Sequence, residues 1–495
     1  MRFGQLAVAT ALSMLLPVAA HAAITFVPGT DGRAFTVAGD ATDLSGLGGS
    51  ATDSRLGAFG SDLFYDSASD TYFGVADRGP GGGVLDFTPR IQGFKLDIDA
   101  NSGAIRGFQL VSTTLLSRAD GQFFNGKNPG LLNGNPSVLG LSFDPEGLTR
   151  RANGNFLLAD EYGPSLYEFS PNGVFIRAFT PPANLIPRRS DGTIDYVAGR
   201  GTIVSGRQDN RGYEGLTLSP DGTRAYAVLQ DPLVGEGSGG DGRRSRNVRI
   251  VEYDVDSGEP LRQFIYQLES RDDINARIPG TANDFGATAQ GRNIGVSSIT
   301  ALADGSFLLI ERDNRGLGEA DPTAALPVGS KRVYRIRLDG ATDVSGVSLA
   351  GTNDLPAGVV PVQKSLYLDV AAAIGPNNVA GEKLEGLTFG RQLADGSLNM
   401  ILITDNDMSV NQPDGSTERF DVCTSGPGGS FTLVQIGAAC PAGQSLIPTT
   451  LYSFRVSGAD AVGVVPEPSS WAMMISGFAL VGLGLRRRAT RVRFA

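Results

Sequence analysis

Histidine is almost missing from this chain of 495 residues, which also contains only one tryptophan and two cysteines. The single histidine, His21, lies in an N-terminal stretch that has the pattern of a removable export signal, so the mature chain would contain none. A chain without histidine has no Ser-His-Asp triad, cannot act as a histidine phosphatase, and has no histidine-ligated zinc. The composition therefore excludes three large classes of hydrolytic chemistry.

The two cysteines, Cys423 and Cys440, lie 17 residues apart in one glycine-rich stretch. Two cysteines without histidine cannot complete a zinc site. In an exported protein, a pair at this spacing predicts a disulfide that closes a loop.

Positive charge is also in deficit. Without the terminal segments, which contain Arg2, Glu467 and five arginines between 486 and 493, the body carries 36 basic and 51 acidic residues. A net charge of about −15 repels nucleic acid, so we expect no nucleic-acid partner. Bound divalent cations would relieve this charge, and we expect the body to be a monomer.

The N-terminal segment, residues 1–22, differs from the body in composition. It begins with Arg2, continues as an apolar run through Leu16, and ends in small residues around His21. This order is typical of a secretory signal peptide. The body would then begin at residue 23.

The C-terminal segment, residues 465–495, has three parts. Val465-Pro466-Glu467-Pro468 precedes an apolar run to Leu485, and Arg486-Arg487-Arg488 follows. The run is somewhat shorter than the roughly 20 residues of a spanning helix, and the arginines would stay cytoplasmic. We therefore expect residues 23–464 to form the exported body.

The three-part tail resembles the PEP-CTERM sorting signal of Gram-negative bacteria. The resemblance implies export across the inner membrane, transient membrane anchoring and processing by an exosortase. Proteins with this signal are associated with exopolysaccharide and the cell surface, so exosortase and exopolysaccharide are the expected partners.

One phrase, Glu-Gly-Leu-Thr, recurs along the body. It begins at Glu146, Glu214 and Glu385, and a degenerate copy is Ser298-Ile299-Thr300. Each copy leads through a turn rich in Gly, Asp or Asn into an apolar strand that ends in acids. Near the N-terminus, the strand 72–76 also ends in an acid, Asp77. Five related units along one chain indicate a repeat architecture.

The repeats predict an all-β fold, a β-propeller. Short β-branched and aromatic runs separated by Asp-Gly and Asn-Gly turns are typical of antiparallel strands. Units of three or four strands with a period of about 70 to 90 residues fit propeller blades. Because five units are visible and a sixth could lie within 100–140 or 341–380, we expect six blades. A β-helix has shorter repeats, and a two-sheet sandwich does not explain the recurring acids.

The period exceeds the usual blade length, so the sequence also predicts insertions between strands. Four stretches are the candidates: 184–208, 235–246, 271–292 and 412–445.

The geometry of a hairpin predicts that the acids meet. A tight turn makes the strands on either side antiparallel, so the residue that enters the first strand and the one that leaves the second lie at the same end. In a propeller the first strand of each blade lines the central channel. We therefore expect one channel mouth to gather the strand-end acids as metal ligands: Asp77, Asp160, Glu161, Asp231, Glu311, Asp313, Asp405 and Asp407.

Carboxylates gathered without histidine repel one another unless cations lie among them. Oxygen ligands alone suit Ca²⁺, with Mg²⁺ or Mn²⁺ as alternatives. Acids at strand ends can also cap loops or hold one structural Ca²⁺, and this alternative stays open for each aspartate. A strand start has no intrinsic need for glutamate, so Glu146, Glu214 and Glu385 are the predicted catalytic carboxylates.

Basic residues are interleaved with these acids. Arg78, Arg211, Arg312 and Lys383 would contact an anion beside the metals. Cations that polarise a phosphate ester and activate water, together with basic groups that hold its oxygens, make a site for phosphoester hydrolysis. Arg78, Arg211 and Arg312 are the predicted phosphate anchors.

The phrases 144–148, 213–216 and 384–387, with Ala159-Asp160-Glu161 and 76–79, resemble the family described as esterase-like activity of phytase. The likeness spans about residues 45–454. It implies a β-propeller whose repeated Glu and Asp carry a phosphodiesterase- or phytase-like activity, with Ca²⁺ as cofactor. Two departures leave the carboxylate ring incomplete: Ser298 in the fourth unit, and Ala58-Phe59-Gly60 in the first.

The leading hypothesis is an exported, Ca²⁺-dependent hydrolase of phosphate mono- or diesters. A Ca²⁺-dependent lactonase or arylesterase would use the same cations without phosphate anchors. A third hypothesis is a non-catalytic propeller of the cell surface or exopolysaccharide matrix that uses Ca²⁺ for rigidity.

Overall fold

The computed structural model describes residues 23–413, 418–458 and 461–463. The expected signal peptide and nearly all of the C-terminal tail lie outside the described residues. Within the described part of the chain, no helix is long and apolar enough to cross a membrane.

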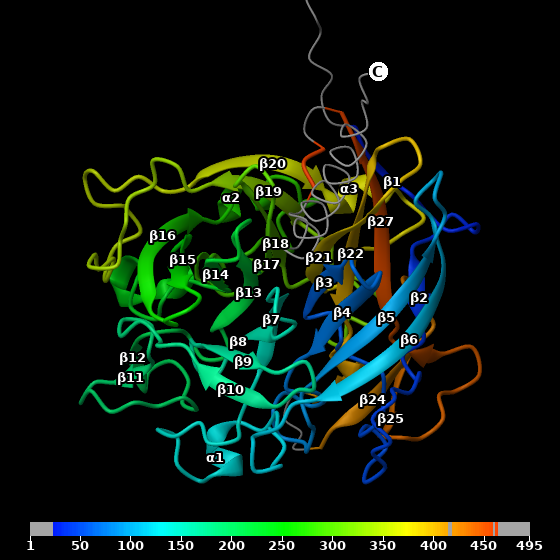
Figure 1. Ribbon diagram of the computed structural model, residues 1–495, viewed down its shortest axis with the longest axis horizontal. Helices are drawn as coiled ribbons and strands as arrows, with labels where there is room; N and C mark the ends of the chain where they lie inside the picture. The colour runs from blue at the N-terminus through cyan, green and yellow to red at the C-terminus, as the bar shows by residue number, and fades with distance from the viewer. Residues whose placement is uncertain (1–22, 414–417, 459–460, 464–495) are drawn as a thin grey trace, which may run out of the picture.

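Five sheets surround a common axis (Figure 1). The first sheet contains β3 (Asp62–Asp66), β4 (Thr71–Ala76), β5 (Arg90–Ile98) and β6 (Ile105–Leu115). The second contains β7 (Pro145–Arg150), β8 (Phe156–Asp160), β9 (Leu166–Phe169) and β10 (Phe175–Ala178). The third contains β13 (Tyr213–Leu218), β14 (Arg224–Leu229), β15 (Asn247–Asp254) and β16 (Pro260–Gln267). The fourth contains β17 (Ile294–Ala301), β18 (Phe307–Asp313), β19 (Lys331–Arg337) and β20 (Gln363–Asp369).

The fifth sheet joins the two ends of the described chain. It contains β21 (Lys383–Gln392), β22 (Leu398–Asp405), β27 (Thr449–Ser457) and β1 (Ala23–Phe26), and β2 (Phe35–Val37) also pairs with β27. Strand β1 is antiparallel to β27, so main-chain hydrogen bonds close the ring of sheets.

The ring contains five blades among the described residues, which corrects the expected six. The inner strands β3, β7, β13, β17 and β21 contact one another in that order, and β21 contacts β3. The two stretches that were candidates for a sixth unit instead provide outer strands: 105–115 is β6 and 363–369 is β20. Their weak apolar pattern follows from this position, since both strands are largely solvent-accessible on one face. The propeller fold itself is confirmed.

All four predicted insertions lie between strands. The stretch 184–208 contains the hairpin β11 (Arg188–Arg189) and β12 (Ile203–Ser205), and 235–246 contains the 3₁₀ turns η1 (Ser238–Gly240) and η2 (Gly242–Arg244). The stretch 271–292 contains α2 (Arg271–Asn275) and η3 (Ala287–Ala289). Two further short helices are α1 (Pro129–Leu132) and α3 (Val370–Ala373).

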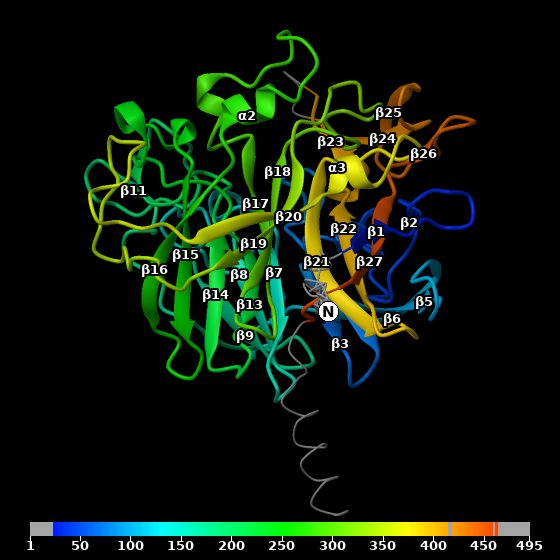
Figure 2. The same cartoon turned by 90° about the horizontal axis from the view of Figure 1, so that it is seen from above.

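The fourth insertion forms a small sheet beside the fifth blade. It contains η4 (Asp407–Ser409), β23 (Val410–Asn411), β24 (Phe420–Thr424), β25 (Phe431–Gln435) and β26 (Ser445–Leu446). The predicted disulfide between Cys423 and Cys440 is formed here. Helix α2 and this sheet lie at the same end of the blades (Figure 2).

The recurring Glu-Gly-Leu-Thr phrase is explained by the packing of the inner strands. The glycine lies where the next inner strand approaches most closely: a Cβ on Gly215 would meet the Ile299 nitrogen at 2.7 Å. The leucine is buried between blades, as Leu216 is. The threonine joins neighbouring blades, because the Thr217 hydroxyl accepts a 3.0 Å hydrogen bond from the Ala301 amide.

The glutamate of each copy is the extra residue of a β-bulge. The pairing of inner and second strands skips one residue between Pro145 and Gly147, between Tyr213 and Gly215, and between Leu384 and Gly386. A bulge redirects the side chain of the extra residue. The fourth blade has the same irregularity between Val296 and Ser298, so the residue equivalent to the glutamates is Ser297 rather than Ser298.

The close approach of inner strands predicts that Gly215→Ala destabilises the protein. The added methyl group would meet main-chain atoms of β17, which cannot move without shifting a whole blade. Overpacking of this kind costs about 1–3 kcal/mol, which urea denaturation measures. The matched control is Gly346→Ala in an exposed loop, where a Cβ meets nothing within 4 Å. Equal stability of the two variants would contradict this account of the motif.

Candidate functional site

Strand register decides which side chains reach the channel mouth where the inner strands begin. Three positions per blade are equivalent: the bulge residue, the residue two before it, and the residue paired with the latter on the second strand. In the second, third, fourth and fifth blades these positions hold Asp144, Glu146 and Glu161; Gly212, Glu214 and Gln230; Gly295, Ser297 and Arg312; and Lys383, Glu385 and Asp405. Asp77, directly after β4, completes the set, which we call the carboxylate mouth.

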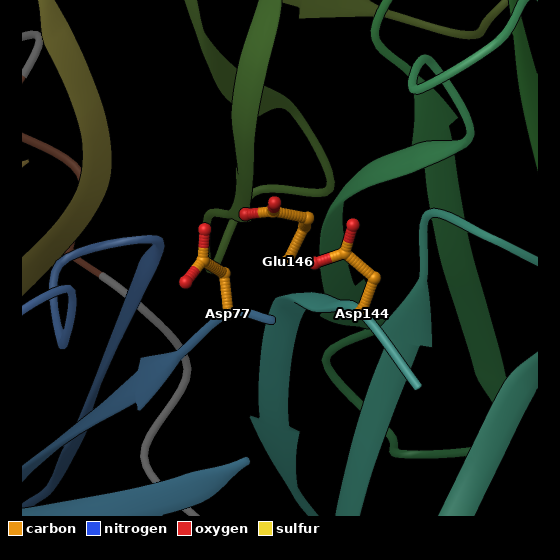
Figure 3. Close-up of side chains that lie close together, drawn as sticks. All are labelled: Asp77, Asp144 and Glu146. Carbon is orange, nitrogen blue, oxygen red and sulfur yellow. The ribbon is translucent and has the colours of Figure 1, made fainter. Parts of the chain in front are cut away.

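Asp77 is the common member of two groups of carboxylates. Its oxygens lie within 4.8 Å of those of Asp144 and Glu146, and also within 4.8 Å of those of Asp405 and Asp407. Figure 3 shows the first group, in which Asp77 from the end of β4 faces Asp144 and Glu146 from the start of β7. The sequence prediction that acids of different blades converge is therefore met by these five residues.

Burial and mutual repulsion raise the pKa of most of these acids. Burial is the largest cause for Glu146, and Glu214 and Asp144 add to the rise of its pKa. For Asp77, burial and the neighbouring Asp405 raise the pKa, while Lys383 opposes the rise. The pKa values of Asp144 and Asp405 are raised to about 7, again mainly by burial.

The predicted phosphate anchors each form ion pairs with acids of the mouth. Arg78 lies 3.1 Å from Asp144 and 3.7 Å from Glu161. Arg211 contacts Asp231 through Nε at 2.9 Å, at the side of the mouth near the third blade. These two arginine side chains keep some exposure, 15% and 21%. Both are oriented by carboxylates and still accessible to a small anion.

Arg312 is more deeply enclosed than the other two arginines. Its Nη2 contacts Glu385 Oε1 and lies 3.6 Å from Glu214 Oε1. The remaining oxygen of each glutamate, Oε2, is buried and has no hydrogen-bond partner. Glu214 Oε1 also accepts a 2.5 Å hydrogen bond from Gln230.

Three of the predicted metal ligands have structural partners instead. Asp160 accepts main-chain hydrogen bonds from Asp144, Tyr162 and Gly163. Asp313 accepts from the amides of Gly329 and Ser330 and pairs with Lys331. A one-residue step along a strand turns the side chain to the other face, so acids adjacent in sequence diverge in space.

Glu311 points between the third and fourth blades rather than into the mouth. It accepts hydrogen bonds from the Tyr266 hydroxyl at 2.7 Å and from Lys364 Nζ at 2.6 Å. It occupies the strand position of Asp160, while Arg312 occupies that of Glu161. Only strand pairing distinguishes these roles.

The set of predicted ligands did not include Asp144, although it lies closer to the mouth than several that were chosen. The available signal was its position two residues before Glu146, which matches Lys383 two residues before Glu385. Lys383 pairs with Asp407 at 2.6 Å and Asp405 at 3.4 Å, so it offsets part of the charge.

A cavity of about 780 Å³ lies at the opposite mouth, where the inner strands end. Phe64, Thr149, Thr217, Thr300 and Phe389 are among its lining residues. Asp62 separates it from the carboxylate mouth, because its carboxylate accepts hydrogen bonds from the Leu148 amide of β7 and the Ser298 hydroxyl of β17. This cavity has no carboxylate cluster.

The donor set at the carboxylate mouth fits a hard divalent cation. The carboxylates of Asp77, Asp144, Glu146, Asp405 and Asp407 provide only oxygen, as Ca²⁺ prefers. The unpartnered Oε2 atoms of Glu214 and Glu385 show that the mouth holds more acceptors than the protein itself satisfies. Buried acceptors without donors are costly, and cations or bound water would remove that cost.

The raised pKa values predict that the metal-free protein loses stability as pH rises. An acid whose folded pKa is raised stabilises the fold fully below its unfolded pKa, near 4, and that contribution is lost as pH rises through the folded pKa. For Asp144 and Asp405 that folded value is about 7. The melting temperature in EDTA should therefore fall between pH 5 and pH 8.

Calcium should reverse this trend, because it binds the deprotonated carboxylates. The rise in melting temperature on adding Ca²⁺ should be larger at pH 8 than at pH 5. Asp77→Asn should abolish most of that rise, whereas Asp354→Asn, an exposed loop control, should leave it unchanged. A Ca²⁺ response of equal size at both pH values would contradict the assignment of these groups.

Known proteins similar to this chain are few in sequence and varied in structure. An uncharacterized secreted protein of Arthroderma benhamiae is 30% identical over 315 residues, which are 52% of this chain and 59% of that protein. A luciferin-regenerating enzyme shares 12% identity over 83% of this chain and 96% of its own, with a TM-score of 0.31.

Two further solved structures are similar at the same level. The PQQ-bound aldose sugar dehydrogenase of Streptomyces coelicolor shares 13% identity over 88% of this chain and 99% of its own, with a TM-score of 0.30. The Dos1 propeller shares 10% identity over 79% and 66%, with a TM-score of 0.24. No inference about this chain is drawn from scores this low.

Two sequence families match the chain. The PEP-CTERM protein-sorting motif matches residues 464–488, which confirms the resemblance of the tail. The family described as esterase-like activity of phytase matches residues 54–408, which include the first four blades and most of the carboxylate mouth. This chain therefore belongs to the phytase-like family, with a PEP-CTERM sorting motif at its C-terminus.

Proposed function

We propose that this protein is an exported, Ca²⁺-dependent hydrolase of phosphate mono- or diesters that acts at the carboxylate mouth. The observation that carries the proposal is the position of Asp77, whose carboxylate belongs to two separate groups of acids. Membership of the phytase-like family supports a phosphate ester as substrate.

The acids of the two groups would hold the cation: Asp77, Asp144, Glu146, Asp405 and Asp407. Bound Ca²⁺ supplies polarisation of a phosphoryl oxygen and lowers the pKa of nearby water. Mg²⁺ or Mn²⁺ are the alternative ions for the same oxygen ligands.

The chain's own groups would move the proton and orient the phosphate. Glu146 is buried among other carboxylates, which raise its pKa and make its carboxylate a stronger base for a proton from water. Arg78 and Arg211 are held by acids and are partly exposed at the mouth, so their remaining N–H groups would donate to phosphate oxygens. Glu214 and Glu385 would complete the negative wall opposite.

The tail supports a place for this activity outside the inner membrane. The sorting motif implies recognition by an exosortase, and the name of the Arthroderma benhamiae relative includes the word secreted. We propose transient anchoring by residues 465–495 and a role at the cell surface, with exopolysaccharide as a neighbouring partner.

Hydrolysis of phytate and of a chromogenic phosphodiester tests the proposal. We expect turnover with Ca²⁺, none in EDTA, and at least a 100-fold loss in Asp77→Asn, because that change removes the carboxylate shared by both groups. Asp354→Asn is the surface control and should keep full activity. If Ca²⁺ raises the melting temperature but neither ester is hydrolysed, the protein is instead the non-catalytic propeller.

Arg211→Ala distinguishes phosphate from carboxylate esters. Loss of a phosphate anchor should raise KM for the phosphodiester about tenfold, whereas hydrolysis of a lactone or aryl ester should not change. The measurement is the ratio of kcat/KM on the two substrates. A variant that loses neither activity, in a protein that hydrolyses aryl esters, would favour the lactonase or arylesterase.

A further inference from the structure

The fourth blade differs from its neighbours at the carboxylate mouth. Its three mouth positions hold Gly295, Ser297 and Arg312, and none of them is an acid. The second blade has acids at all three: Asp144, Glu146 and Glu161. Negative charge is therefore concentrated away from the fourth blade.

Arg312 uses the space that the missing glutamate leaves. The bulge residue of its own blade is the small Ser297, so the guanidinium extends over it toward both adjoining blades. There Nη2 contacts Glu385 of the fifth blade and lies 3.6 Å from Glu214 of the third. One guanidinium thus joins the two glutamates that flank the gap.

All three side chains are removed from water. Glu214 and Glu385 are each 2% exposed, and Arg312 is 9% exposed. Two carboxylates buried side by side repel each other unless a positive charge lies between them. The arginine is permanently charged, so it meets this need without a metal.

The pair still has unused ligand atoms. Oε2 of Glu214, Oε2 of Glu385 and Nε of Arg312 are all buried without a hydrogen-bond partner. Gln230 holds Oε1 of Glu214, and Glu382 is a further acid whose charge acts on Arg312. Two oxygens therefore face a position whose present cation does not satisfy them.

We propose that Arg312 is a fixed internal cation that stands where a divalent metal ion would otherwise bind between Glu214 and Glu385. The carboxylate mouth then has two halves, a metal-binding half around Asp77 and an arginine-held half at the fourth blade. Removal of the guanidinium converts the second half into an additional site for a hard divalent cation such as Ca²⁺. The inference rests on the proposed cation site but not on hydrolysis.

Equilibrium dialysis against Ca²⁺, with the bound metal measured by atomic absorption, tests the inference on the full chain. Arg312→Ser should bind one more Ca²⁺ per chain than the unchanged protein, and its melting temperature should rise more on adding Ca²⁺. Arg312→Lys keeps the charge and should bind no additional ion. Arg312→Gln, which retains hydrogen-bonding groups, should also gain one ion, and it replaces Arg312→Ser if the serine variant does not fold.

Arg211→Ser is the matched control, because it removes an arginine of the same mouth that pairs with Asp231 rather than with Glu214 and Glu385. It should leave the Ca²⁺ stoichiometry unchanged. If neither Arg312→Ser nor Arg312→Gln gains an ion, or if Arg312→Lys gains one as well, the inference is overturned. An unchanged protein that binds no Ca²⁺ would overturn the proposed function instead, so the two failures are distinguishable.

Discussion

The close packing of five inner strands around one axis is the constraint on which the rest of this structure depends. Glycine at the contact positions, such as Gly215 and Gly386, lets the main chains approach. Because each glycine follows a β-bulge, the preceding residue is turned toward the channel mouth. The same device that packs the blades therefore also gathers glutamates from different blades into one small, buried volume. Their repulsion is a direct consequence of how the propeller closes.

That repulsion is offset unequally around the ring. Arg78 and Lys383 lie among the acids of the first, second and fifth blades, where Asp77 joins two carboxylate groups. At the fourth blade, Arg312 is enclosed by Glu214 and Glu385. A repeat architecture with identical blades would place the same charge at every position. Departures from the repeat, such as serine at position 297, are what allow one side to hold a metal and the other an arginine.

Much of the fold was predictable, because the propeller signal lies in local features: turn residues, apolar strands and the Glu-Gly-Leu-Thr phrase. The blade number was not, since outer strands such as β6 and β20 face solvent and lack a strong pattern. Within the site, the convergence of Asp77, Glu146 and Asp405 followed from hairpin geometry. Asp160 and Glu311 have the same sequence signature but point elsewhere, because alternate strand residues face opposite sides.

The sequence by itself determined the chemistry that this protein has at its disposal. Without a mature histidine and with its only cysteines in a disulfide, the body has carboxylates and arginines as its reactive groups. It also determined the repeat and the sorting motif, since both are read from contiguous residues. Only the tertiary structure decided which acids meet, because strand register and bulges select side chains one residue at a time. Asp144 joins the site and Asp313 leaves it for that physical reason.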